Sequence, residues 1–388
     1  MKILIIKEYN PYHGSNARNN RLRSLINGLL DENAEVDLFV AAPSEHLDLN
    51  YPSKLNVIFL SKSNVKSSLI AKIINKVVFL HPTLIYKRIR EKMVKEYDCI
   101  WLDRGKTMTL VGLKMMKMKK HYFFQEMGEF SWIGFDTRYS MYSQKKIHEI
   151  YINEFIPGLN SMAVISNTLG EYYKEFNPTA KLLHLPMTVE MSRFDLIKKE
   201  SSVDYVGYCG TLNCKKDGVD ILVRSFIKIM DDFPNLELRI AGPLTPVTDY
   251  HTILNIINKS NAIKRVKLLG LYDRNEIPSF LKNSKLLALS RPKSKQAEGG
   301  FPTKLGEYLA TGVPVCVTNV GEITQYLTHK ESAYIAEPNS VKSFADVMRM
   351  ALENPDSKKV GNNGKIVAEN QFSSKVQSKR LYKFLGTI

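Results

Sequence analysis

The sequence has few cysteines, only Cys99, Cys209, Cys214 and Cys316 among 388 residues. They form no C-x-x-C pair, and no histidines lie near them at the spacing of metal ligands. A disulfide framework or a zinc site would need such patterns. We therefore expect four free thiols in a reducing compartment and no metal site.

Long apolar runs are also missing, because no stretch reaches the roughly 20 residues that span a bilayer. The chain begins with MKILII and passes directly to charged and polar residues, without the small-residue cleavage site of a secretory signal. The first residues are therefore predicted to form a buried strand. These observations predict a cytoplasmic protein.

Acidic residues are fewer than basic ones, and the formal net charge is +16. Such a charge attracts polyanions, which include nucleic acids, anionic lipids and phosphorylated ligands. The sequence has no helix-turn-helix, zinc-finger or RNP pattern, and its basic stretches are not interleaved with aromatic residues. This argues against a nucleic-acid partner.

What the sequence does contain is a repeated alternation of short apolar runs and helical stretches. Most of the runs are continuously apolar, as expected for parallel strands covered by helices on both faces. The first set lies at 2–7, 35–40, 56–60, 98–102, 121–125 and 162–166, and the second at 204–209, 236–241, 265–270, 285–290, 313–318 and 332–337. The pattern predicts two Rossmann-like, doubly wound α/β domains that face a cleft.

The predicted domain boundary lies in the polar stretch that begins near residue 190. We expect one Rossmann-like domain over 1–190 and a second over 191–370. The last residues, 371–388, are predicted to form a helix that crosses back to the first domain. Because ligands of parallel sheets bind beyond the carboxyl ends of the strands, residues that follow strands are the candidates for a site.

The most informative segment is EGGFPTKLGEYLATGVPVCVT, from Glu298 to Thr318, which follows an apolar strand. Gly299 and Gly300 are predicted to form a tight turn, which Phe301 and Pro302 stiffen, before a helix that starts around Thr303. Unpaired amides and the helix dipole make such a helix start a site for a diphosphate. Glu307, one turn later, could accept hydrogen bonds from ribose hydroxyls. The alternative is an ordinary strand–turn–helix unit with a solvated glutamate.

This segment resembles the donor-binding signature of retaining glycosyltransferases with the GT-B fold, specifically glycosyltransferase family 4 (glycosyl transferases group 1). The matching residues are Gly300, Phe301, Pro302, Glu307, Gly312, Pro314, Val315 and Thr318. The resemblance implies that Glu307 holds the donor ribose. It also implies that 1–190 is the acceptor-side domain and that 191–370 is the nucleotide-sugar-binding domain. The family has seven residues between its two glutamates, whereas Glu298 and Glu307 have eight between them. Either Glu298 still reaches the sugar, or backbone amides around Gly299 replace it, which is the interpretation we favour.

A second segment, Gly207 to Leu222, resembles the family element G-R-L-x-x-x-K-G, whose Arg and Lys neutralise the donor diphosphate. Gly210, Leu212 and Lys216 match, but Thr211 stands where Arg is usual. One cation is therefore missing, and Lys215 or a residue from elsewhere is expected to replace it. Lys216 is the candidate for stabilising the leaving nucleoside diphosphate. The alternative is a pair of solvated lysines before a helix.

The first domain gives weaker signals. Gly14, with Ser15, occupies the place of the family's first glycine loop near the donor phosphates. Gly128 stands where many members have a catalytic-side His, which makes Glu126 and Glu129 the nearest ionisable candidates, and Glu129 is grouped with Lys216 as catalytic. Ser166, at the end of a strand, is expected on the acceptor side of the cleft.

The resemblance implies transfer of a hexose-type sugar, from a UDP- or GDP-linked donor, with retention and without a metal or other cofactor. No D-x-D motif follows a strand, which agrees with this expectation. The acceptor is expected to be a glycan or lipid-linked glycan in the synthesis of a bacterial cell-surface polysaccharide such as capsule or lipopolysaccharide. Two alternatives stay open: a nucleotide-sugar epimerase of the same fold, and a non-catalytic nucleotide-sugar-binding homologue.

Residues 61–95 contain nine Lys or Arg and one Glu, with apolar residues at near-helical spacing. This is the composition of a basic amphipathic helix on anionic lipid. A second basic stretch ends at Lys120. Both predict peripheral attachment to the inner face of the membrane. The alternative is that these helices pack on the sheet with their lysines in water.

Overall fold

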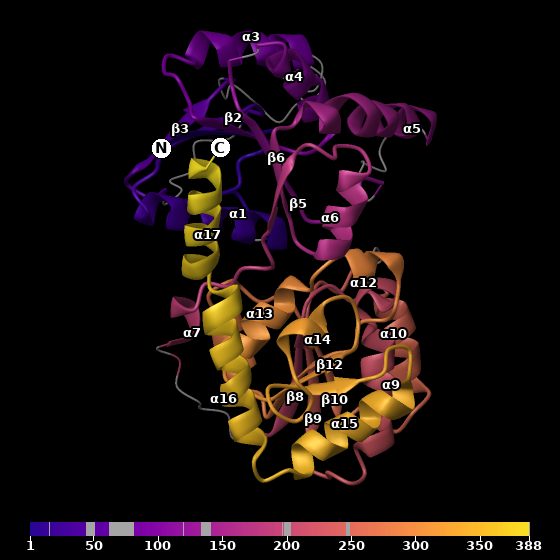
Figure 1. Ribbon diagram of the computed structural model, residues 1–388. Coiled ribbons are helices and arrows are strands. Elements are labelled where there is room, and N and C mark those ends of the chain that lie inside the picture. Colours follow the sequence, from indigo (N-terminus) through magenta and orange to yellow (C-terminus); the bar gives the residue numbers. More distant parts are fainter. Residues whose placement is uncertain are drawn as a thin grey trace. The chain divides into compact units, whose positions relative to one another are not determined.

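The computed structural model describes residues 1–14, 16–43, 51–61, 81–118, 120–132, 141–195, 197, 203–245 and 249–387. The chain divides into two units, which are Met1–Pro186 with Gln377–Ile388, and Met187–Val376. These bounds differ by a few residues from the expected boundaries at 190 and 370. Figure 1 shows the elements of both units.

Unit 1 contains a seven-stranded sheet in which every pairing is parallel, with the order β3-β2-β1-β4-β5-β6-β7. Its strands are β1 (Lys2–Lys7), β2 (Glu35–Val40), β3 (Leu55–Phe59), β4 (Cys99–Leu102), β5 (Phe123–Met127), β6 (Ser161–Val164) and β7 (Lys181–His184). Its helices are α1 (Ala17–Asp31), α3 (Pro82–Lys92), α4 (Lys106–Met116), α5 (Met141–Ile150), the π-helix η2 (Tyr151–Phe155), the 3-10 helix η3 (Ile156–Gly158) and α6 (Asn167–Lys174).

Unit 2 contains a six-stranded parallel sheet with the order β10-β9-β8-β11-β12-β13. Its strands are β8 (Tyr205–Cys209), β9 (Glu237–Ala241), β10 (Val266–Gly270), β11 (Leu286–Leu289), β12 (Val315–Thr318) and β13 (Tyr334–Ala336). Its helices are α7 (Ser192–Asp195), α8 (Cys214–Asp217), α9 (Val219–Ile229), α10 (Tyr250–Asn258), α11 (Ile277–Lys282), α12 (Lys295–Gly299), α13 (Thr303–Ala310), α14 (Ile323–Tyr326), α15 (Val341–Glu353), α16 (Ser357–Val367) and the π-helix η4 (Ala368–Phe372). Two doubly wound parallel sheets are the fold class that the apolar runs predicted.

The local sequence accounts for these elements. In α9 the buried residues Val219, Leu222, Val223 and Phe226 recur at helical spacing and form one apolar stripe. In α1 the side chain of Asn16 caps the first turn by accepting a hydrogen bond from the amide of Asn19. A break at Asn354 and Pro355 separates α15 from α16, because proline cannot continue a helix.

The chain returns to unit 1 through its last helix, α17 (Ser374–Gly386). Leu381 and Leu385 are buried in the hydrophobic cluster that also contains Leu25 and Leu29 of α1. Figure 1 shows α17 beside α1. Lys181 of β7 donates to the carbonyl of Thr387 at 2.9 Å. The core of unit 1 therefore includes both ends of the sequence.

Candidate functional site

Helix α13, which carries the expected donor residues, starts at Thr303 in unit 2. Its N-cap, Pro302, makes no side-chain capping hydrogen bond. The preceding segment is not the predicted glycine turn: Ser294 caps a short helix, α12, which extends through Gly299. Gly300 has an extended backbone, and a Cβ there would lie 2.9 Å from the carbonyl oxygen of Gln296. Gly300 is therefore required by close packing and not by a left-handed turn.

Glu298 lies in the last turn of α12 and is half-buried. Its side chain has no hydrogen bond or ion pair with the described part of the chain. Phe301 is buried against Tyr326 and Phe372, with ring centroids 5.5 and 5.4 Å away. This aromatic contact anchors the loop between α12 and α13, so Phe301 acts on a ligand only through the loop.

Glu307 is held by an arginine that sequence reasoning did not identify. Nη1 of Arg193, in α7, lies 2.5 Å from Oε1 of Glu307, and Nη2 donates to the carbonyl of Arg274 at 2.9 Å. Arg274 in turn pairs with Glu190 at 3.3 Å. Arg193 lies in the polar stretch after residue 190, which has no periodicity. The sequence there therefore gave no local signal for a contact with Glu307, 114 residues away.

The segment after β8, residues 210–218, lies next to α13. Its Gly210 has φ +159°, Thr211 is exposed, and Asn213 caps α8 by accepting from the amide of Lys216. Lys215 and Lys216 are exposed. Gly218 ends α8 in the left-handed conformation, with φ +68°.

Two contacts join this segment to α13. The hydroxyl of Tyr308 accepts from the amide of Cys209 at 2.8 Å. Nζ of Lys304 lies 2.5 Å from Oδ2 of the buried Asp217. The structure therefore brings together the two donor segments that the sequence indicated, and it adds Lys304 and Asp217 to them.

The electrostatics of Lys304 reflect its burial. Burial lowers the pKa of its ammonium group, and the Asp217 carboxylate opposes this, while the charges of Lys216 and Arg291 add to the lowering. The net direction is downward. The site is therefore a place where positive charges repel one another and where an anion would be stabilised.

Two of the residues predicted in unit 1, Ser166 and Glu126, make contacts within the fold. Ser166, expected on the acceptor side, is fully buried and caps α6 by accepting from the amide of Leu169 at 3.2 Å, so its hydroxyl serves the helix start. Glu126 forms a short ion pair with the buried Arg21, which also donates to the carbonyl of Leu185 at 2.8 Å. This pair ties β5 to the segment after β7.

Gly14 is exposed, with φ +77°, and Ser15 lies outside the described residues. Gly128 is exposed, and a Cβ there would have no atom within 4 Å. Glu129 follows it, half-buried, and its carbonyl accepts from the hydroxyl of Tyr173 at 2.8 Å. The carbonyl of Glu129 is thus fixed next to the open position at Gly128.

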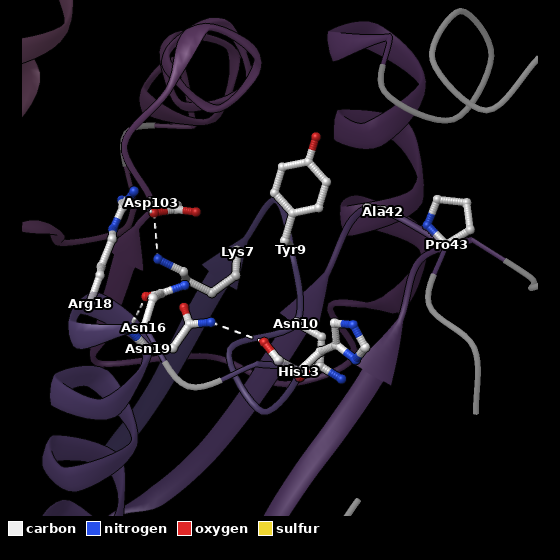
Figure 2. Close-up of a pocket in the computed structure, with 10 residues that line it drawn as sticks. All are labelled: Lys7, Tyr9, Asn10, His13, Asn16, Arg18, Asn19, Ala42, Pro43 and Asp103. Carbon is white, nitrogen blue, oxygen red and sulfur yellow. Dashed lines mark hydrogen bonds and ion pairs between the residues drawn. The ribbon is translucent and has the colours of Figure 1, made fainter. Parts of the chain in front are cut away.

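A cavity of about 630 Å³ lies at the carboxyl ends of β1 and β4 in unit 1. Figure 2 shows Lys7 and Arg18 both reaching Asp103 at one side of it. Arg18 Nη2 lies 2.6 Å from Oδ1 of Asp103, and the amides of Arg104 and Glu8 donate to the same carboxylate at 2.8 and 3.2 Å. The remaining lining residues are Tyr9, Asn10, His13, Asn16, Asn19, Ala42 and Pro43.

The ion cluster of Lys7, Arg18 and Asp103 was not predicted from the sequence, although Lys7 ends one predicted strand and Asp103 directly follows another. Burial would raise the pKa of Asp103, but Lys7 and Arg18 lower it below its usual value. Burial lowers the pKa of Lys7 in spite of Asp103. Asp103 already accepts four hydrogen bonds, so the cations and amides of the cavity are the groups left to meet a ligand.

No group of metal-binding side chains occurs among the residues that the structure describes. Within that same part of the chain, none of the helices is long and apolar enough to cross a bilayer. The basic stretch at 61–95 falls largely outside the described residues, which resume at His81 before α3. The end of the second basic stretch, Lys120, lies just before β5.

Several solved structures share this fold over the whole chain. Sucrose-phosphate synthase from Thermosynechococcus elongatus has a TM-score of 0.75 at 14% identity, covering 100% of this chain and 98% of that one. HepE from Anabaena, in complex with UDP and glucose, has a TM-score of 0.72 at 14% identity and covers 100% of both chains. The lipopolysaccharide outer core galactosyltransferase WaaB has a TM-score of 0.65 at 14% identity, again with 100% of both chains.

These likenesses define the fold as GT-B. The sequence has no significant match among curated proteins. Residues 193–367, nearly all of unit 2, match the family model of glycosyl transferases group 1. Unit 2 is therefore a domain of this family, and the family indicates that the protein is a glycosyltransferase.

Proposed function

We propose that the protein transfers a hexose-type sugar from a UDP- or GDP-linked donor to a glycan or lipid-linked glycan, with retention of configuration. The observation that carries this proposal is the meeting of the two donor segments at the uncapped start of α13, through Lys304 with Asp217 and Tyr308 with Cys209. Helix amides and a buried cation suit a diphosphate. The UDP complexes of HepE, a structure with the same fold, support a nucleotide-sugar donor.

In this proposal the leaving diphosphate is stabilised by protein groups, which are the amides at Thr303 and the ammonium group of Lys216. The carboxylate of Glu307, fixed by Arg193, accepts from the ribose hydroxyls. Retention then follows from attack of the acceptor hydroxyl on the face that the diphosphate leaves, and a phosphate oxygen takes the proton. This mechanism needs no side-chain nucleophile and no metal. Glu129 stays a candidate for a contact on the catalytic side.

The acceptor is proposed to bind unit 1, in the cavity beside Lys7, Arg18 and Asp103. The amide side chains of Asn16 and Asn19 are suited to sugar hydroxyls, because an amide has both donor and acceptor atoms. The bonds within the loop use only Oδ1 of Asn16 and Nδ2 of Asn19, whereas Asn10 is held through both of its amide groups. The likeness to the lipopolysaccharide galactosyltransferase WaaB supports a role in cell-surface polysaccharide synthesis.

The proposed place of action is the cytoplasmic face of a membrane. The described end of the basic stretch supports this idea, because α3 and the residues after it expose Leu84 and Val94 together with Lys87, Arg90 and Lys92. Apolar side chains among cations are typical of a peripheral anchor on anionic lipid.

Titration of the protein with UDP, GDP and their glucose, galactose and mannose conjugates tests the donor. We expect binding of one nucleotide series, slow hydrolysis of its sugar conjugate, and full activity in excess EDTA. Nuclear magnetic resonance of the released sugar in the first minutes reports retention or inversion. An epimerase would instead convert the donor without an acceptor, and a binding homologue would leave it intact over hours.

A further inference from the structure

The donor segment after β8 carries an unexpected carboxylate. The related element has Arg after its first glycine and Lys directly before its last one. Here Thr211 follows Gly210, and Asp217 stands between Lys216 and Gly218. Asp217 is buried, whereas Lys216 is exposed. The buried carboxylate of Asp217 opposes a diphosphate at the place where the related element has only cations.

Lys304 compensates for this charge from the neighbouring helix. Its Nζ lies 2.5 Å from Oδ2 of Asp217 and 3.1 Å from the hydroxyl of Tyr208. Its side chain crosses directly over Gly210, since a Cβ there would lie 2.1 Å from Cε and 2.6 Å from Nζ. The ammonium group thus lies against the backbone next to Thr211.

We propose that Lys304 is the cation that binds the donor diphosphate, in place of the arginine that Thr211 replaces. The carboxylate of Asp217 and the hydroxyl of Tyr208 occupy two of its three N–H donors and aim the third. The side chain is 21% exposed, which leaves it accessible to a ligand. This inference rests on the proposed function, because it assumes a nucleoside diphosphate donor.

The alternative is that Lys304 only neutralises a buried carboxylate. The two roles differ in what they predict for ligands with and without phosphate. A diphosphate contact is lost with the ammonium group, whereas binding of the bare nucleoside is unchanged. A purely structural role would affect both ligands or neither.

The test is calorimetric titration with UDP, GDP, uridine and guanosine. Because Lys304→Met alone would leave Asp217 buried without a partner, the main variant is Lys304→Met with Asp217→Asn, which removes both charges. Lys304→Arg keeps the cation. The matched control is Lys285→Met with Asp204→Asn, an exposed pair 2.7 Å apart in the same unit. Thermal unfolding establishes that each variant is folded.

We expect the Lys304 and Asp217 double variant to bind the diphosphate about tenfold to a hundredfold more weakly, and the nucleoside as the wild type does. Lys304→Arg should recover most of the affinity, and the control should be unchanged. Unchanged diphosphate affinity in the folded double variant, or an equal loss for nucleoside and diphosphate, overturns the inference. If the wild type binds neither UDP nor GDP, the proposed function fails as well.

Discussion

Arg193 and Glu307 form an ion pair of 2.5 Å within unit 2, although 114 residues separate them. The two side chains are 15% and 28% exposed, so the pair is partly shielded from water. Only Oε1 of Glu307 is engaged, and Oε2 has no hydrogen bond in the described part of the chain. The arginine therefore fixes the carboxylate while leaving one oxygen for a ligand.

This geometry makes Arg193 a positioning residue for donor recognition. Arg193→Met should raise the KM for the donor about threefold to thirtyfold with little change in kcat, because one oriented hydrogen-bond acceptor is lost. The specific readout is discrimination between the nucleoside diphosphate and its 2′-deoxy analogue, which should shrink in the variant. Arg193→Lys should restore part of it.

The control for this experiment is Arg349→Met, which removes an exposed pair with Asp232 at 2.8 Å. Its KM and 2′-hydroxyl discrimination should equal those of the wild type. If Arg193→Met leaves discrimination intact, the carboxylate is positioned by other contacts and the role given to Arg193 is wrong.

The sequence was sufficient for most of both sheets, since continuous apolar runs such as 98–102 and 313–318 contain the strands β4 and β12. The edge strand β7 was not among the predicted runs. It was also sufficient for the start of α13 at Thr303, because Phe301 and Pro302 mark the boundary. It was not sufficient for α12, although Ser294 followed by helix-forming residues is a local signal that could have been used.

The partners of the charged residues could not be predicted in the same way. Lys304 and Asp217 are 87 residues apart, and Arg21 and Glu126 are 105 apart. Local periodicity describes which face of an element is buried and gives no information on which side chains meet across elements. The burial of Ser166 belongs to this class too, because a serine that ends a strand can equally cap the next helix, as it does here.

A series of glycine substitutions should separate backbone strain from steric clash. Gly270 has φ +77°, and a Cβ added there would have no atom within 4 Å, whereas Gly218 has φ +68° and would place its Cβ 2.0 Å from the carbonyl oxygen of Ser290. We expect Gly270→Ala to cost about 1–2 kcal/mol of unfolding free energy. Gly218→Ala should cost more and should weaken nucleotide binding.

Urea denaturation of both variants, with Gly128→Ala as the reference, measures these costs. Gly128 has open space around it and does not have a positive φ, so its substitution should change stability by less than about 0.5 kcal/mol. Equal losses for Gly218→Ala and Gly270→Ala would mean that the contact with Ser290 relaxes without cost.

Membrane attachment through the basic stretch predicts salt-sensitive binding to anionic vesicles. Lys87 and Arg90 are exposed on α3, next to the exposed Leu84. Lys87→Glu with Arg90→Glu should reduce sedimentation with phosphatidylglycerol vesicles severalfold, because each cation near such a surface contributes about 1 kcal/mol. The matched reversal is Lys358→Glu with Lys359→Glu, exposed on α16, which should have no effect. Equal loss in both variants would indicate a general effect of net charge.

The ion cluster at the cavity of unit 1 should make the protein sensitive to acid. The pKa of Asp103 is below its usual 3.8, so the unfolded chain binds the proton more readily, and the stability from this group is present above that value and lost as pH falls. Lys7 does not reverse this trend, because its pKa is lowered from 10.5 and its contribution makes stability rise with pH between that lowered pKa and 10.5.

The measurement is the urea midpoint between pH 6 and pH 3 for the wild type and for Lys7→Met with Asp103→Asn. Removing both charges should flatten the decline by up to about 1 kcal/mol over this range, because only below pH 3.8 does the unfolded carboxyl gain as much as about 1.4 kcal/mol per pH unit from protonation. The exposed pair of Lys285 and Asp204 provides the control, because Lys285→Met with Asp204→Asn should decline as the wild type does. A wild-type slope that persists in the variant without Asp103 would show that the acid sensitivity does not come from this ion cluster.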